Sequence, residues 1–166
     1  PRLTTRVVEW NDPAALEAAL AEGDVAAVLA EPAMTNIGII LPDPGYHAKL
    51  RELTRRHGTL LVIDETHTLC AGPGGCTRAW NLEPDFVVAG KPLASGIPAA
   101  VYGFTAEVAR AFAEVVRVDD ADVGGIGGTL AGNALSMAVM RATLREILTG
   151  SYYARSNALQ DRFVAG

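Results

Sequence analysis

The sequence predicts an α/β fold in which a mostly parallel sheet is flanked by helices. Three short runs, at 25–30, 59–63 and 85–89, are rich in Val, Leu and Ala and apolar on both faces. Such runs are typical of strands in a parallel sheet, because helices cover both sides of that sheet. Segments with helical periodicity alternate with the runs, and this alternation indicates an α/β architecture.

The first helix is expected to begin near Pro13 and to run to about Ala21. The short apolar run 6–10 ends at Asn11, a candidate N-cap, and proline is favoured in the first turn that follows a cap. Gly23 comes just after the helix, where glycine commonly ends helices.

The rest of the chain continues the alternation. The segment 44–57 carries Tyr46, Leu50 and Leu53 at helical spacing and stops before Gly58. A fourth strand follows the third after a short connection, so this last pair is able to run antiparallel. The remaining expected elements are a strand at 99–104 and helices at about 106–116 and 130–148.

Composition argues against several classes of function. The net charge is −5, and the largest basic cluster is 55–57, so we expect no nucleic-acid partner. No apolar run reaches the length of a membrane helix, and no signal peptide is recognisable, so we expect no membrane association. Cys70 and Cys76 are too far apart for a CxxC pair and are expected to be reduced thiols of a cytoplasmic protein.

Charged side chains follow the predicted parallel strands. Glu31 follows the first, Asp64 and Glu65 follow the second, and Lys91 follows the third. Ligands of open α/β sheets bind outside the carboxyl ends of the strands, so we expect these groups to meet at one edge. Pro92 disfavours helical geometry at the residue before it, so Lys91 is expected to continue extended from its strand.

Other ligand sites fit less well. The glycine-rich segment 124–128 follows acidic, loop-like sequence rather than a strand, so it fails as a dinucleotide fingerprint. The motif at 90–92 is GKP and no GxSxG occurs, which argues against a P-loop and a hydrolase elbow. A metal site on His67 with Asp64 and Glu65 remains an alternative, but the other two histidines lie on or beside another helix, and we expect no metal.

A pyridoxal-phosphate site matches the chemistry of these residues. This cofactor needs a lysine for its aldehyde, a carboxylate facing its pyridinium nitrogen and phosphate donors at a helix N-terminus or glycine-rich turn. Lys91, Asp64 and the Gly-Gly-Thr sequence ending at Thr129 supply these three parts. The lysine would form a Schiff base and, once displaced by a substrate amine, would move a proton.

The order of motifs along the chain resembles that of class III pyridoxal-phosphate aminotransferases of fold type I. The branch around glutamate-1-semialdehyde aminomutase is the most similar. The matching motifs span about residues 25–149. They are Glu31-Pro32, LLVIDE at 60–65, EPD at 83–85, GKP at 90–92, GIP at 96–98 and GTLAGN at 128–133.

The resemblance implies roles for individual residues. It implies that Asp64 pairs with the pyridinium nitrogen and that Lys91 binds the cofactor covalently and shuttles a proton. It also implies that Thr129, with the backbone of Gly128, contacts the phosphate from the neighbouring subunit. The active site would then be shared within a homodimer.

Three further cofactor-binding residues follow from the same resemblance. Thr66 occupies a position that packs on one face of the ring, where valine is usual. Asn36 matches an asparagine near the phenolic oxygen of the cofactor. His67 stands where glutamine or methionine is usual. It is expected either to donate a hydrogen bond to that oxygen, or to lie behind the residues that touch the cofactor or in solvent.

The resemblance also implies a domain organisation. Residues 1–149 correspond to part of the cofactor-binding large domain, its second half, and 150–166 to the start of the connection to a smaller domain. The chain begins with Pro1, which indicates a processed, truncated or excised piece.

The expected function is amino-group transfer between an amino donor and a keto or aldehyde acceptor. The alternatives are an intramolecular aminomutase of the glutamate-1-semialdehyde type and a non-catalytic fragment of such an enzyme.

Overall fold

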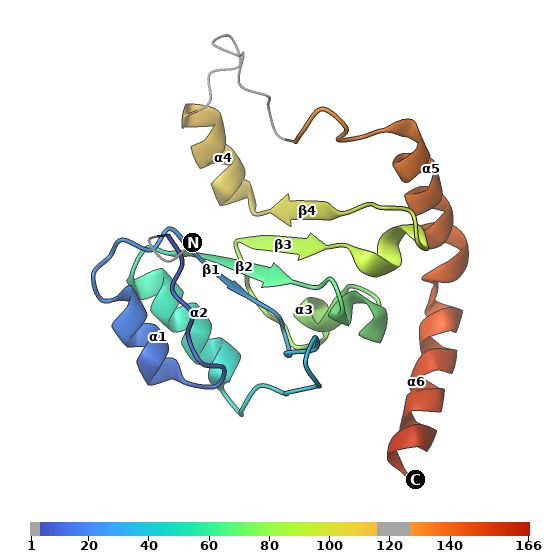
Figure 1. Ribbon diagram of the computed structural model, residues 1–166, viewed down its shortest axis with the longest axis horizontal. Coiled ribbons are helices and arrows are strands. Elements are labelled where there is room, and N and C mark those ends of the chain that lie inside the picture. The colour runs from blue at the N-terminus through green and yellow to red at the C-terminus, as the bar shows by residue number, and fades with distance from the viewer. Residues whose placement is uncertain (1–3, 116–126) are drawn as a thin grey trace.

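A four-stranded sheet organises the chain in the computed structural model, which describes residues 4–115 and 127–166 (Figure 1). The strands lie in the order β1-β2-β3-β4. β1 pairs with β2 and β2 with β3 in parallel, while β3 and β4 are antiparallel. This arrangement confirms the predicted α/β class. The bounds are Ala27–Ala30, Leu60–Asp64, Phe86–Ala89 and Val101–Phe104.

Two helices pack against the first half of the sheet. α1 (Pro13–Leu20) and α2 (Tyr46–Arg56) lie side by side next to β1 and β2 (Figure 1). The spacing of apolar residues in α2 puts them on one face, which meets alternate residues of β2. The buried core that results contains Leu16, Leu20, Tyr46, Leu50, Leu53, Leu61 and Ile63.

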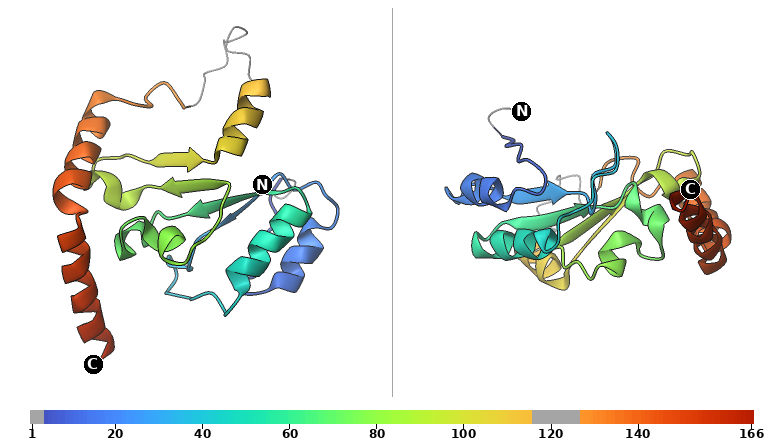
Figure 2. Two further views of the ribbon diagram at one scale, coloured as in Figure 1. Left: turned by 180° about the vertical axis from the view of Figure 1, so that it is seen from behind. Right: turned by 90° about the horizontal axis from the view of Figure 1, so that it is seen from below.

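The opposite face of β1 and β2 is more exposed than the apolar runs predict. Leu29 of β1 is 67% exposed and Leu60 of β2 is 39% exposed. The side view in Figure 2 shows α2 and α3 (Gly75–Ala79) on one side of the sheet. Two large apolar side chains on the other face are therefore left partly open to solvent.

The N-cap of α1 is Asp12 rather than the predicted Asn11. The Asp12 side chain accepts a hydrogen bond from the backbone N–H of Ala15 at 2.9 Å. Asn11 instead has a φ of 63°, and its side chain donates to the carbonyl of Leu41 and accepts from the N–H of Asp43. Asparagine tolerates this left-handed conformation, so Asn11 ties the chain entry to a distant loop while its neighbour caps the helix.

Short helices join the later elements. η1 (Thr68–Ala71) and α3 follow β2, and η2 (Lys91–Ala94) follows β3. A second buried cluster forms where Leu93 of η2 meets Ala89 and Met140. The remaining helices are α4 (Ala106–Val115), α5 (Ala134–Ala142), the π-helical turn η4 (Thr143–Ile147) and α6 (Gly150–Val164).

The last predicted helix begins later than its periodicity indicates. Asn133 caps α5 by accepting from the N–H of Ser136 at 3.0 Å, so the helix starts at Ala134 rather than near Leu130. α6 extends away from the sheet toward the C-terminus (Figure 1). It covers the segment predicted to begin the connection to a smaller domain, and that assignment remains a prediction.

Within the described residues, the structure contains no helix of the length and apolarity needed to span a membrane.

Candidate active site

The parallel strands bring their carboxyl ends to one edge of the sheet. Ala30 of β1 is in register with Ile63 of β2, so Glu31 and Asp64 follow at the same level. Asp64 is in turn in register with Val88 of β3, three residues before Lys91. The edge predicted from the strand ends therefore carries two carboxylates and one amine, and it is the edge at which open α/β sheets bind ligands.

Lys91 is the first residue of a short helix, which corrects the expectation that it continues extended. Gly90 precedes it with φ −138° and ψ −96° and makes the bend out of β3. The N–H of Leu93 then donates to the carbonyl of Gly90 at 2.9 Å and closes the first turn. Pro92 fits here because a proline near the start of a helix lacks only an N–H that has no intrahelical partner.

The amine of Lys91 lies against the ring of His67. Lys91 Nζ and His67 Nε2 are 2.7 Å apart. The other ring nitrogen, Nδ1, is hydrogen-bonded to the hydroxyl of Thr35, and this hydroxyl donates to the carboxylate of Glu31. Four side chains from three parts of the chain thus form one hydrogen-bonded row that ends at the amine.

The carboxylate of Asp64 is only partly engaged. Its Oδ1 accepts from the backbone N–H of Thr66 at 2.8 Å. No hydrogen bond within residues 4–115 and 127–166 reaches Oδ2, and the side chain is half-buried. Thr66 itself packs close to Gly90, where a Cβ would lie 3.4 Å from the threonine Oγ1. Oδ2 of Asp64 is therefore able to accept a hydrogen bond from an additional donor. Thr66 and Gly90 pack closely next to it.

Glu65 follows Asp64 but serves the fold rather than the edge. Its side chain is fully buried and accepts from the hydroxyl of Thr68 and from the backbone N–H groups of Cys76 and Thr77. A buried carboxylate needs such donors to offset its lost hydration. Glu65 thereby fixes the start of α3 to the end of β2.

The other predicted cofactor residues lie in exposed segments. Asn36 is exposed in the loop after β1, where it forms an isolated bridge with Gly38. Gly128 and Thr129 are exposed in the turn before α5, and the carbonyl of Gly128 accepts from the N–H of Ala131. Within the described ranges, no hydrogen bond joins these residues to Lys91, and their roles remain predictions.

Thr35 is the member of the row that the sequence does not single out. Glu31, His67 and Lys91 are each marked by a strand end or a motif, whereas Thr35 lies in a loop. This loop is closed by paired backbone hydrogen bonds between Met34 and Ile40. A hydroxyl residue four positions after a strand-end carboxylate is the one local signal present.

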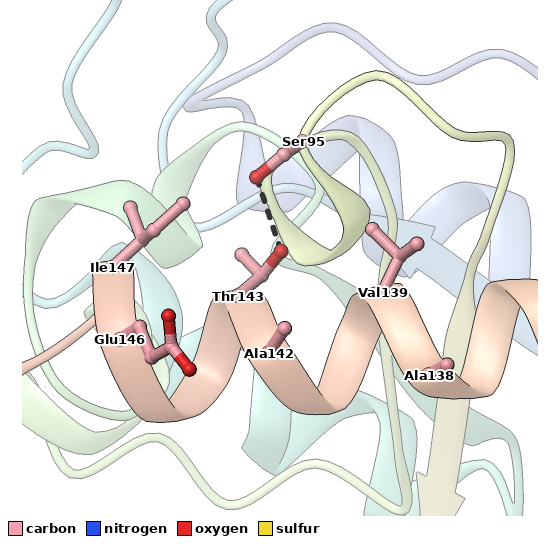
Figure 3. A pocket seen from close by; sticks show the side chains of 7 residues that line it. All are labelled: Ser95, Ala138, Val139, Ala142, Thr143, Glu146 and Ile147. Atoms are coloured by element: carbon pink, nitrogen blue, oxygen red, sulfur yellow. Dashed lines mark hydrogen bonds between the residues drawn. The ribbon is translucent and has the colours of Figure 1, made fainter.

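An apolar pocket lies where the end of η2 meets α5 and η4, and Lys91 is not among its lining residues. Its volume is about 350 Å³, and the hydroxyls of Ser95 and Thr143 are hydrogen-bonded at its rim, 3.0 Å apart (Figure 3). Glu146 is its one charged lining residue. Its other lining residues are small or apolar, and they are Ser95, Ala138, Val139, Ala142, Thr143 and Ile147.

The edge therefore carries the kinds of side chain that chemistry at an amine uses. It places a lysine, an imidazole and carboxylates together, which is a set of groups that binds carbonyl compounds covalently and moves protons. Among the residues that the structure describes, no group of three or more His, Cys, Asp or Glu side chains is placed to hold a metal ion.

Comparisons with known proteins agree with this chemistry. The family model for class-III aminotransferases matches residues 9–166. The chain is 41% identical over 159 residues to glutamate-1-semialdehyde 2,1-aminomutase of Sorangium cellulosum, covering 94% of this chain and 35% of that protein. It is also 41% identical over 145 residues to the enzyme of the same name from Methanoculleus marisnigri, covering 86% of this chain and 34% of that protein. The chain thus spans about a third of the length of these relatives.

Solved structures give the same result. A glutamate-1-semialdehyde aminomutase from Pseudomonas aeruginosa superposes with a TM-score of 0.82 at 56% identity, covering 89% of this chain and 33% of that one. A variant of that enzyme with a lysine replaced by alanine was solved in complex with PMP. A β-phenylalanine aminotransferase from Variovorax paradoxus matches with a TM-score of 0.78 at 27% identity, covering 95% of this chain and 37% of that one. The chain, with its lysine and aspartate at the carboxyl edge of the sheet, belongs to the class-III aminotransferase family.

Proposed function

We propose that Lys91 anchors pyridoxal phosphate in an enzyme that moves an amino group within one substrate molecule. The observation that carries this proposal is the amine of Lys91 at the carboxyl edge of the sheet, at the end of the strand next to Asp64. The similarity to aminomutases at high coverage of this chain supports the intramolecular reaction over transfer between two molecules.

The residues present fit the cofactor. The Lys91 side chain is exposed, so its amine is accessible to an aldehyde, and Asp64 keeps Oδ2 for a protonated ring nitrogen. Thr66 lies beside Gly90 at the edge of the sheet. Its β-branched side chain is able to pack against the flat ring of the cofactor. Family members use pyridoxal phosphate, and PMP, seen bound to the Pseudomonas variant, is the aminated form of that cofactor.

Each residue then has a defined task. Lys91 holds the cofactor and moves the proton of the substrate, while the negative charge of Asp64 keeps the ring nitrogen protonated. When bound, the cofactor supplies an electron sink for a substrate carbanion. We further propose that Asn36 and His67 face the phenolic oxygen of the cofactor. Gly128 and Thr129 would contact the phosphate group of the cofactor that is bound in the neighbouring subunit of a homodimer.

We infer the substrate class from the relatives' names. A glutamate-1-semialdehyde 2,1-aminomutase exchanges an amino group and a carbonyl between two adjacent carbons, so reactant and product are isomers. An aminotransferase reaction, with an amino donor and a keto or aldehyde acceptor, is the second candidate, which the family itself supports.

Both cysteines are free thiols, which supports a cytoplasmic location.

Covalent labelling tests the cofactor site sharply because the sequence contains only two lysines, Lys49 and Lys91. Lys49 lies on α2 and pairs with Glu52 at 3.0 Å, so it is a matched internal control. After incubation with pyridoxal phosphate and reduction with borohydride, peptide mapping is expected to find the label on Lys91. No label on Lys91, or equal labelling of Lys49, would overturn the proposed site.

Turnover separates the two reactions. The protein loaded with cofactor is expected to convert glutamate-1-semialdehyde to its isomer with no added amino acceptor. A strict requirement for an acceptor would instead identify an aminotransferase. Specific labelling without either reaction would identify a cofactor-binding but non-catalytic fragment. Sedimentation of the labelled protein tests the homodimer.

A further inference from the structure

The hydrogen-bonded row at the sheet edge fixes the tautomer of His67. A hydroxyl has one proton to donate, and that of Thr35 goes to the carboxylate of Glu31, which only accepts when ionised. The Thr35 oxygen must therefore accept the hydrogen bond that joins it to His67 Nδ1. It follows that Nδ1 carries the ring proton of neutral His67 and that Nε2 has a free electron pair.

That free electron pair faces Lys91. Nε2 lies 2.7 Å from Lys91 Nζ, so the histidine accepts a hydrogen bond from the amine. We propose that His67 is a catalytic base that takes a proton from the Lys91 ammonium, with Thr35 and Glu31 as positioning residues. This inference rests on the proposed function only in that Lys91 is the reactive amine, and it adds the group that accepts a proton from that amine.

The proton transfer is balanced within the row. One N–H bond of the Lys91 ammonium breaks, its electron pair stays on Nζ, and the proton forms a new bond to Nε2 of His67. A lysine ammonium is the weaker acid in water, so the imidazolium needs stabilising. The carboxylate of Glu31 lies 3.6 Å from Nδ1, and it supplies an opposite charge to the half-buried ring of His67. A neutral amine is the form that attacks a carbonyl carbon.

His47 provides the opposite tautomer in the same molecule. Its Nε2 lies 2.7 Å from the carbonyl oxygen of Pro32, and a carbonyl only accepts, so His47 carries its proton on Nε2. The two histidines differ in the direction of their hydrogen bonds. His47 therefore serves as an internal reference for the assignment of His67.

Nitrogen NMR of the imidazole rings tests the tautomer without any cofactor. In the cofactor-free protein, above the pH at which histidines are protonated, His67 is expected to show the Nδ1–H pattern and His47 the Nε2–H pattern. Thr35→Ser keeps the hydroxyl and is expected to keep the pattern, whereas Thr35→Val is expected to lose it. Unchanged signals of His47 verify that each variant is folded. An Nε2–H pattern for His67, or no response to Thr35→Val, would overturn the assignment.

Acetylation by an N-hydroxysuccinimide ester tests the base itself. Mass spectrometry of the cofactor-free protein gives the rates at Lys91 and Lys49, and their ratio corrects for reagent and pH. His67→Ala is expected to lower the ratio about a hundredfold, the lower limit typical of a positioned general base. An unchanged ratio would refute the role of His67. If the NMR pattern and the fall in the acetylation ratio are both observed but borohydride labelling of Lys91 fails, the proposed cofactor site is refuted. The proposed role of His67 as a base is then still supported.

Discussion

Gly75 lies directly against the carboxylate of Glu65. A Cβ placed on Gly75 would come within 2.3 Å of Glu65 Oε2, and the φ of Gly75 is +64°. The absence of a side chain at Gly75 is therefore what lets the buried carboxylate accept the hydrogen bonds from Cys76 and Thr77 at the start of α3.

Gly75→Ala is expected to destabilise the protein by about 3 kcal/mol, from left-handed strain and the collision with a buried side chain. Gly72→Ala is the matched control, because Gly72 has a φ of 176° and no atom within 4 Å of its Cβ position. Urea denaturation measures both variants. Equal midpoints for the two would contradict this account of Gly75.

The ion pair between Arg51 and Asp85 is expected to contribute to stability in a pH-dependent way. The two guanidinium nitrogens lie 2.7 and 2.8 Å from the two carboxylate oxygens, and the N–H of Leu61 also donates to Asp85. Burial raises the pKa of Asp85, but the hydrogen bonds from Arg51 and Leu61 outweigh it, so the pKa is lowered. A lowered pKa means that the carboxylate stabilises the fold above its unfolded-state pKa, about 3.9, and that this is lost as the pH falls through the folded-state pKa.

Asp85→Asn is accordingly expected to cost about 2 kcal/mol near pH 7, since one partner of a largely buried pair is removed. The difference from the wild type is expected to shrink in acid. Glu83→Gln serves as control because Glu83 and its partner Arg55 are 67% and 58% exposed, and exposed pairs contribute about 0.5 kcal/mol. Urea denaturation of both variants and of the wild type, at neutral and at acidic pH, measures these differences in the free energy of unfolding. A constant difference at all pH values would show that Asp85 acts through packing alone.

The two cysteines are expected to react at very different rates. Burial, with the nearby Glu65 carboxylate, raises the pKa of the Cys76 thiol to about 11, whereas Cys70 is exposed. Because the thiolate is the reactive form, Cys76 is expected to react at least about a hundredfold more slowly than Cys70 near pH 8. Alkylation with iodoacetamide and peptide mapping measure both rates. In denaturant the two rates should converge, and equal rates in the native protein would contradict the burial of Cys76.

Asp64→Asn is expected to weaken cofactor binding while preserving the fold, on the proposed function. The amide oxygen still accepts from the N–H of Thr66, but the negative charge that Oδ2 offers is lost. A hydrogen bond to a charged group contributes about 1.5–3 kcal/mol, so affinity for pyridoxal phosphate should fall about ten- to a hundredfold. Titration followed by absorbance measures this loss. Asp161→Asn, on the exposed side of α6, should bind as the wild type does, and equal affinity of both variants would remove Asp64 from the site.

Local patterns in the sequence carry much of the fold and part of the site. Each parallel strand is a short apolar run with a charged residue at its end or within two residues after it, so β1, β2, β3 and the edge with Asp64 and Lys91 follow from the sequence. The helical start at Lys91 does not follow, because the preceding Gly90 makes a bend that the rule for residues before proline does not consider.

The row of side chains depends on tertiary structure. Thr35 and His67 are 32 residues apart and meet because parallel pairing puts the segments after β1 and β2 side by side. No periodicity marks such a pair. The capping role of Glu65 is hidden for the same reason, since the N–H groups of α3 that donate to it begin eleven residues later, at Cys76.

The strand order β1-β2-β3-β4 has a consequence for synthesis on the ribosome. Among the four strands that the structure describes, spatial order equals chain order, so each emerging strand can pair with the edge left by its predecessor. Glu31, Thr35 and His67 leave the ribosome before Lys91 does. Lys91 is therefore the last member of the hydrogen-bonded row to be synthesised, after the three side chains that lead to its amine.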